Sequence, residues 1–102
     1  MSKQLKHSLF VRLDAKPGKE AEVEAFLAQG LQLANAEATT PLWFALKLGE
    51  RSYAIFDSFY DEAGRQAHLD GPIAKALMAK APELLATPPS IEPLDVLGVK
   101  AA

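Results

Sequence analysis

The stretch SYAIFDSFYDEAGRQAHLDGP, residues 52–72, joins a predicted strand directly to a predicted helix. Its first half has the mixture of aromatic and branched side chains that is typical of a half-buried strand. Asp61 is a good N-cap for the helix that leads to His68. Large side chains on the strand that face the small residues Gly64 and Ala67 are expected to leave a gap beside His68. The stretch therefore predicts a small-molecule pocket with one titratable group.

The end of this helix is marked by two residues with opposite backbone preferences. Gly71 suits the left-handed position that ends a helix, and Pro72 suits the first turn of the next one. We expect Pro82, Pro88 and Pro89 to prevent continuation of the second helical segment, because proline disrupts a helix interior. Residues 91–97 predict a last strand, and Pro93 makes it an edge or bulged strand because proline cannot donate to a sheet ladder.

The first half of the chain predicts two more strands and one helix. Residues 9–13 alternate between an apolar face and a second face that carries Phe10 and Arg12. Residues 42–48 predict another strand, and a Gly-containing turn leads from it into the strand that begins near Ser52. The helix between these strands has an apolar stripe with the spacing of one helical face. This stripe contains Val23, Phe26, Leu27, Gly30, Leu31 and Ala34.

The predicted order is β-α-β-β-α-β, which is that of a ferredoxin-like α+β fold with a four-stranded antiparallel sheet. A chain of 102 residues suits one domain over residues 1–102, with a flexible N-terminus at residues 1–7. Helices cover one sheet face, and the other face should then be polar, but Phe10, Trp43, Ala45 and several third-strand aromatics leave neither face cleanly polar. We therefore expect a homodimer in which two sheets pack face to face about a two-fold axis.

Composition excludes several classes of function. The net charge is −2 and the eleven basic residues are scattered, so a nucleic-acid partner is not expected. The chain has no cysteine, and its two histidines lack ligand spacing, so we expect no metal or iron–sulfur cofactor. Phosphate-loop and dinucleotide glycine patterns are also missing. Residues 1–7 lack the apolar run of a signal peptide, and no segment is long enough to span a bilayer, which favours a cytoplasmic protein.

Three polar side chains have alternative interpretations. His68 is a candidate general base, because a neutral imidazole accepts a proton near neutral pH. Alternatively, it is a partly buried histidine that is hydrogen-bonded to a backbone carbonyl or to water. Asp57, in the middle of the third strand, is expected to pair with Arg12 or with another cation. Arg65 is expected to be a solvated helix residue, with the alternative that it steers an anionic group.

The chain resembles an antibiotic-biosynthesis-monooxygenase domain of the dimeric α+β barrel superfamily in its strand order, in the break between its helical segments at Gly71 and Pro72, and in its last strand. The resemblance extends from about His7 to Lys100, and its most telling signal is the strand that leads into the helix with Ala63 and His68. Members typically form homodimers whose sheets join into a barrel. Several oxygenate electron-rich aromatic compounds without metal or flavin, in a pocket between sheet and helices that the histidine-bearing helix lines.

The chain departs from this family in two places and from its haem-degrading branch in three. Residues 38–41 replace the usual Pro-Gly turn, and residues 64–65 replace a bulky apolar residue. The resemblance aligns Val11, His68 and Met78 with the asparagine, tryptophan and haem-ligating histidine of haem-degrading members. Haem degradation is therefore disfavoured, and the same alignment implies that these three residues line the pocket.

The resemblance implies a cofactor-independent monooxygenase that acts on a quinol, a phenol or a polycyclic aromatic compound, with His68 as the base. The expected substrate-binding residues are Val11, Phe26, Leu27, Phe44, Phe56 and Met78. The alternatives are a non-catalytic small-molecule-binding or dimerisation module of the same fold, or an isomerase or lactonase of the same barrel type. A pocket closed by side chains would favour the module, and an open cavity that reaches His68 would favour the enzyme.

Overall fold

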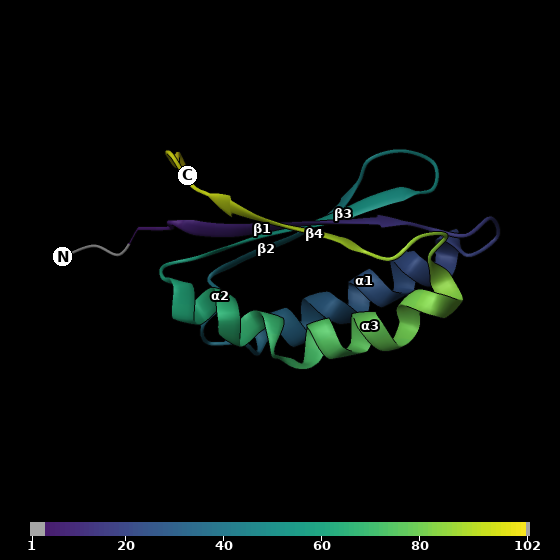
Figure 1. Cartoon of the computed structure of the whole chain (residues 1–102), viewed down its shortest axis with the longest axis horizontal. Helices are drawn as coiled ribbons and strands as arrows, with labels where there is room; N and C mark the ends of the chain where they lie inside the picture. Colours follow the sequence, from purple (N-terminus) through teal and green to yellow (C-terminus); the bar gives the residue numbers. More distant parts are fainter. Residues whose placement is uncertain (1–3, 102) are drawn as a thin grey trace.

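The computed structural model describes residues 4–101, which form one antiparallel sheet with helices on one of its faces (Figure 1). The elements in chain order are β1 (His7–Asp14), α1 (Glu20–Asn35), β2 (Leu42–Lys47), β3 (Ser52–Phe59), α2 (Glu62–Leu69), α3 (Pro72–Leu84) and β4 (Ser90–Asp95). The strands lie in the order β2-β3-β1-β4. The predicted ferredoxin-like α+β fold is confirmed, and β4 is an edge strand as Pro93 indicated.

The core lies between the helices and the inner face of the sheet, which we define as the face that the helices cover. Alternate residues of β1 and β3 meet α1 and α3 there. The buried cluster contains Val11, Leu13, Ala15, Val23, Leu27, Tyr53, Ile55, Leu77, Ala81, Leu84 and Leu85. Each fully buried side chain of leucine size stabilises the fold by about 1.5–3 kcal/mol relative to exposure.

Helix α1 buries most of the predicted apolar stripe, but Leu31 is 43% exposed and was wrongly placed in the core. The stripe turns outward at this point because α1 runs along the β2 edge of the sheet. Gly30 allows close packing, because a Cβ atom there would lie 3.3 Å from the ring of Trp43 and the ring would have to shift. The tryptophan ring therefore rests directly on the α1 backbone.

The second half of the chain confirms two helix boundaries and corrects two others. Asp61 accepts a hydrogen bond from the Gly64 amide at 2.8 Å, and α3 begins at Pro72. Gly71 has an extended backbone with φ −90° and ψ −177°, so it is the N-cap of α3 and not a left-handed residue. Helix α3 also continues through Pro82, because burial of the helix end, including Leu84, offsets a proline cost of about 3 kcal/mol.

The outer face of the sheet, away from the helices, carries an aromatic row. Phe44, Phe56 and Phe10 are opposite one another on the neighbouring strands β2, β3 and β1. The sequence-based placement of Trp43 and Ala45 on this face was wrong, because the Trp43 ring packs against α1 on the inner face. Phe44 is 51% exposed. The aromatic row is therefore an apolar surface that residues 4–101 leave partly uncovered.

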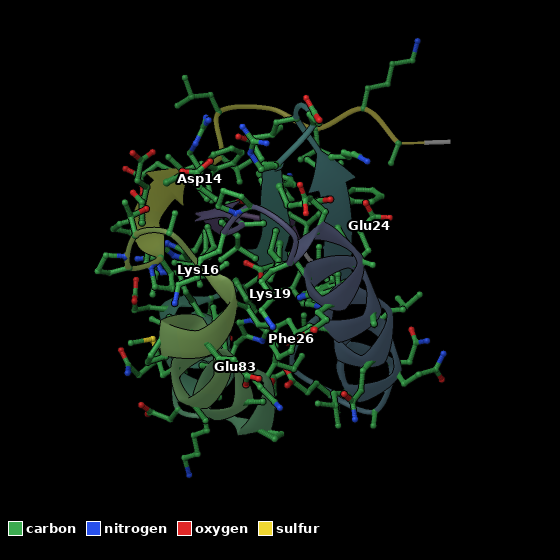
Figure 2. The ribbon with its side chains drawn as sticks, turned by 90° about the vertical axis from the view of Figure 1, so that its right-hand side faces the viewer. Asp14, Lys16, Lys19, Glu24, Phe26 and Glu83 are labelled. Atoms are coloured by element: carbon green, nitrogen blue, oxygen red, sulfur yellow. The ribbon has the colours of Figure 1, made fainter. Side chains whose placement is uncertain are left out.

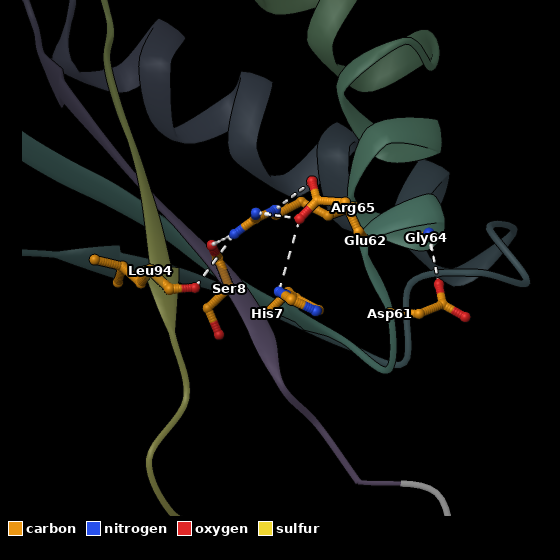
Figure 3. A network of polar contacts seen from close by, with 7 residues as sticks. All are labelled: His7, Ser8, Asp61, Glu62, Gly64, Arg65 and Leu94. Carbon is orange, nitrogen blue, oxygen red and sulfur yellow. Dashed lines mark hydrogen bonds and ion pairs between the residues drawn. The ribbon is translucent and has the colours of Figure 1, made fainter.

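A polar network fastens α2 to the sheet (Figure 3). Arg65 donates hydrogen bonds to the backbone carbonyls of Ser8 and Leu94 and pairs with Glu62. Its side chain is only 12% exposed, so it is neither solvated nor free to steer an anion. His7, expected in a flexible N-terminus, begins β1 with its Nδ1 atom 3.7 Å from Oε2 of Glu62, while residues 1–3 lie outside the described residues.

Within residues 4–101, none of the helices has the length and apolar character needed to cross a membrane.

Candidate functional site

Helix α2 turns Gly64 and His68 toward the sheet, since residues four apart share a helix face. Ala67, expected on that face, is exposed. The space at Gly64 is also filled, because a Cβ atom there would lie 3.1 Å from the Thr39 carbonyl oxygen and 3.2 Å from Oδ1 of Asp61. The loop between α1 and β2 therefore occupies the place where a gap was expected.

His68 is buried between two carboxylates from different parts of the chain. Its Nδ1 atom lies 2.8 Å from Oε1 of Glu37, and its Nε2 atom lies 3.0 Å from Oδ2 of Asp57. Thr40 donates a hydrogen bond to the same Glu37 oxygen at 2.7 Å. The Asp57 side chain is fully buried and that of Glu37 is 14% exposed. We call these four residues the His68 cluster.

The His68 cluster favours a protonated imidazole. Burial has the largest single influence and lowers the pKa of His68, but the contacts with Asp57 and Glu37 together outweigh it and raise that pKa. Neither Asp57 oxygen accepts a hydrogen bond of good geometry within residues 4–101, so its contact with His68 is chiefly an ion pair. An imidazolium flanked by two carboxylates has no free nitrogen with which to accept a substrate proton.

Of the two pairings expected for Asp57, the one with Arg12 is wrong and the one with another cation is confirmed. Arg12 belongs to the outer face of β1, where its Nε atom lies 3.4 Å from Oδ2 of Asp14. Asp57 faces the helices, and its cation comes from α2. Among the residues that the structure describes, no group of three or more histidine, aspartate or glutamate side chains could hold a metal ion.

A pocket of about 400 Å³ lies between α1 and the edge strand β2. We call it the α1–β2 pocket. Its lining is Glu24, Leu27, Ala28, Leu31, Trp43, Phe44, Ala45, Leu46, Lys47 and Tyr53. The volume is within the range of about 300–1,000 Å³ that is usual for small-molecule sites. Leu27 and Phe44, two of the expected substrate-binding residues, belong to this lining.

One wall of the α1–β2 pocket carries a hydrogen-bonded charge pair. The hydroxyl of Tyr53 donates to Oε2 of Glu24 at 2.6 Å, and Nζ of Lys47 donates to the same oxygen at 3.0 Å. Figure 2 shows Glu24 on α1, beside the sheet. The Tyr53 hydrogen bond, followed by Lys47, lowers the pKa of Glu24, and the same Glu24 bond raises the pKa of Tyr53.

Sequence reasoning missed Glu24, Trp43, Lys47 and Tyr53 as pocket residues. Two spacing signals could have found Glu24, Trp43 and Lys47. Glu24 is three, four and seven residues before Leu27, Ala28 and Leu31, which places these four on one helix face. Trp43, Ala45 and Lys47 alternate along β2 and so share a strand face.

The remaining expected binding residues lie in four different surroundings. Val11 belongs to the buried core, and Phe26 lies between α1 and α3 (Figure 2). Phe56 belongs to the aromatic row on the outer face. Met78 is 56% exposed and lines a shallow cavity with Pro82 and other residues near the start of β4. None of these surroundings, nor the α1–β2 pocket, includes His68 in its lining.

Comparison with known proteins places this fold in a structural class. No family model matches the chain, and no curated protein matches it. Solved structures from Nitrosomonas europaea and Caulobacter crescentus, provisionally named antibiotic biosynthesis monooxygenases, have TM-scores of 0.80 and 0.79. The first is 11% identical over 95% of this chain and 96% of its own, and the second is 21% identical over 93% and 92%. The antibiotic-biosynthesis-monooxygenase fold that the sequence predicted is therefore confirmed.

A second Nitrosomonas europaea structure is much more similar in sequence. It is the crystal structure of NE2512, a protein of unknown function, with 55% identity and a TM-score of 0.94. The alignment covers 99% of this chain and 98% of that one. This chain belongs to the same family as NE2512.

Proposed function

We propose that this protein binds an aromatic small molecule in the α1–β2 pocket, and that His68 has a structural role. The observation that carries the proposal is the pocket of about 400 Å³ itself, whose lining includes Trp43, Phe44 and Tyr53. Aromatic side chains stack favourably on an aromatic ligand and contribute about 0.5–1.5 kcal/mol for each such pair beyond the area buried. His68 is already engaged by Glu37 and Asp57.

The functional unit that we propose is a homodimer. The aromatic row of Phe44, Phe56 and Phe10 is a continuous apolar surface across three strands. A second copy packed sheet to sheet about a two-fold axis would remove this surface from water, because the same patch then faces itself. Phe44 belongs both to the aromatic row and to the pocket lining, so dimerisation would place the partner close to the bound ligand.

Trp43 gives a direct test of binding, because it is the one tryptophan of the chain and lines the pocket. Titration with an aromatic probe such as 2-naphthol should quench or shift its fluorescence with saturation. Ala28→Phe should fill the pocket and abolish this response. Ala25→Phe is the matched control, since Ala25 is also exposed on α1 but does not line the pocket. Equal quenching in both variants would exclude the α1–β2 pocket as the binding site.

A second candidate function is cofactor-independent oxygenation of an aromatic compound. It is favoured by the fold that the chain shares with the two structures provisionally named antibiotic biosynthesis monooxygenases. In such a reaction a ring CH₂ group of a phenol becomes C=O, or a ring C–H of a quinol becomes C–OH while the quinol is oxidised to a quinone. In both cases one atom of dioxygen enters the product and the other leaves as water. His68 could act as the base only after it lost its proton and moved away from Asp57 and Glu37.

An oxygen electrode separates the two candidate functions. A panel of quinols and polycyclic phenols that quenches Trp43 without oxygen uptake supports a binding protein. Oxygen uptake that is stoichiometric with product supports the oxygenase. Its loss in a His68→Gln variant that circular dichroism shows to be folded would contradict a purely structural His68.

A further inference from the structure

We propose that Glu24 selects the ligand of the α1–β2 pocket, favouring an uncharged aromatic compound that carries a hydrogen-bond donor over an aromatic anion. This inference rests on the proposed function of the pocket and names the chemistry of its ligand. It concerns a residue that lies on a different helix from His68, and it does not depend on whether the ligand is also transformed.

One carboxylate oxygen of Glu24 is free to accept a hydrogen bond from a ligand. Its Oε2 atom accepts hydrogen bonds from both Tyr53 and Lys47, whereas no donor within residues 4–101 is bonded to Oε1. The side chain is half exposed, at 50%, and lines the pocket. A ligand donor can therefore reach Oε1 without breaking an existing hydrogen bond. A hydrogen bond to an ionised acceptor is also stronger than one between neutral groups.

The charges in the pocket lining disfavour an anionic ligand. Among its lining residues the charged ones are Glu24 and Lys47, and these already neutralise each other at 3.0 Å. The hydroxyl proton of Tyr53 is donated to Glu24. A ligand carboxylate would therefore be repelled by the negative charge of Glu24 and would have to share an ammonium group that Glu24 already neutralises. An uncharged donor has neither cost.

The ionisation of the Glu24 carboxyl group favours the same kind of ligand. Hydrogen bonds from Tyr53 and then Lys47 lower its pKa, so the carboxylate stays ionised near neutral pH. An ionised carboxylate only accepts hydrogen bonds. The preference of Glu24 for hydrogen-bond donors over acceptors should therefore hold at all pH values near neutral.

Three probes of one ring system test the proposal by Trp43 fluorescence. 2-Naphthol carries a donor, 2-methoxynaphthalene lacks it, and 2-naphthoate is an anion. We expect the wild-type protein to bind 2-naphthol about tenfold more tightly than 2-methoxynaphthalene, which is the effect of one hydrogen bond to a charged group. Binding of 2-naphthoate should be the weakest. Glu24→Gln should reduce the preference for 2-naphthol to about twofold or less and strengthen the binding of 2-naphthoate.

Glu20→Gln is the matched control. It removes the same charge from the same helix, but Glu20 does not line the pocket, and the wild-type order of the three probes should remain. If Glu24→Gln keeps the wild-type preference, or if Glu20→Gln loses it equally, the selective role of Glu24 is wrong while the pocket still stands. If the wild-type protein binds none of the three probes, the proposed function fails together with this inference.

Discussion

The Nδ1 atom of His68 lies 2.8 Å from Oε1 of Glu37, and this contact joins α2 to the loop that follows α1. The opposite nitrogen of the same ring lies 3.0 Å from Asp57 in β3. One side chain thus connects two helical regions to the middle of the sheet. Two buried carboxylates and one imidazolium remain a stable arrangement only while all three are present.

Removing His68 should therefore destabilise the fold strongly. His68→Ala leaves Asp57 and Glu37 buried without their cation, and loss of one partner of a buried ion pair costs about 3–5 kcal/mol. Urea denaturation would measure this as a fall in the free energy of unfolding. His7→Ala is the control, because His7 makes a more exposed contact at 3.7 Å with Glu62. A loss below about 1 kcal/mol for His68→Ala would contradict the proposed structural role.

The stability that His68 contributes should decrease as the pH rises. Because its folded-state pKa is raised, this contribution is fully present below the unfolded-state pKa of about 6.5 and is lost as the pH rises through the folded-state value. The difference in unfolding free energy between wild type and His68→Gln should shrink over that interval. Urea titrations from mildly acidic to mildly alkaline pH, together with NMR titration of the His68 ring, would check it. A difference that is constant or increases with pH would exclude a raised pKa.

Gly30→Ala should give no gain in stability, although alanine is favoured over glycine in a helix by about 1 kcal/mol. The new Cβ atom would lie 3.3 Å from the Trp43 ring and force it toward the pocket. The emission of Trp43 should change, and 2-naphthol should bind less tightly. Gln29→Ala is the control, as an exposed neighbour on α1 that does not line the α1–β2 pocket. A stabilised Gly30→Ala variant with unchanged emission would show that the ring is not held against the helix.

Local signals in the sequence were sufficient for much of the fold. Asp61 and Pro72 marked the starts of α2 and α3 because capping and first-turn preferences depend on neighbouring residues alone. The alternation in β1 identified its buried face for a similar reason. Pro93 indicated an edge strand because proline has no N–H group to donate to a neighbouring strand and is therefore rare in the middle of a sheet.

The candidate site depended on contacts that local signals do not contain. The partners of His68 come from a loop and a strand, and Glu37 precedes it by 31 residues. The orientation of β2 was ambiguous because large apolar residues occupy both of its faces. That ambiguity was resolved only by the contact between Trp43 and Gly30 in α1. The pocket lining could not be assigned before that contact was known.

The proposed homodimer predicts that one charge on the outer face is enough to separate the subunits. Phe10 is the β1 member of the aromatic row, opposite Phe56 of β3. In Phe10→Lys a sheet-to-sheet dimer would bury two ammonium groups and the Glu92 carboxylates opposite them, and the desolvation of each ion costs several kcal/mol. Sedimentation at micromolar concentration should show a wild-type dimer and a Phe10→Lys monomer. Circular dichroism should stay unchanged, because this side chain lies outside the core.

Ala25→Lys is the control for this last experiment, since it adds the same charge at an exposed position on the opposite side of the molecule. It should sediment as the wild type does. A wild-type monomer at micromolar concentration would exclude the dimer, and a Phe10→Lys dimer would place the interface elsewhere than on the aromatic row. In the second case the proximity of the partner to Phe44 and the ligand would be wrong, whereas ligand binding itself would be unaffected.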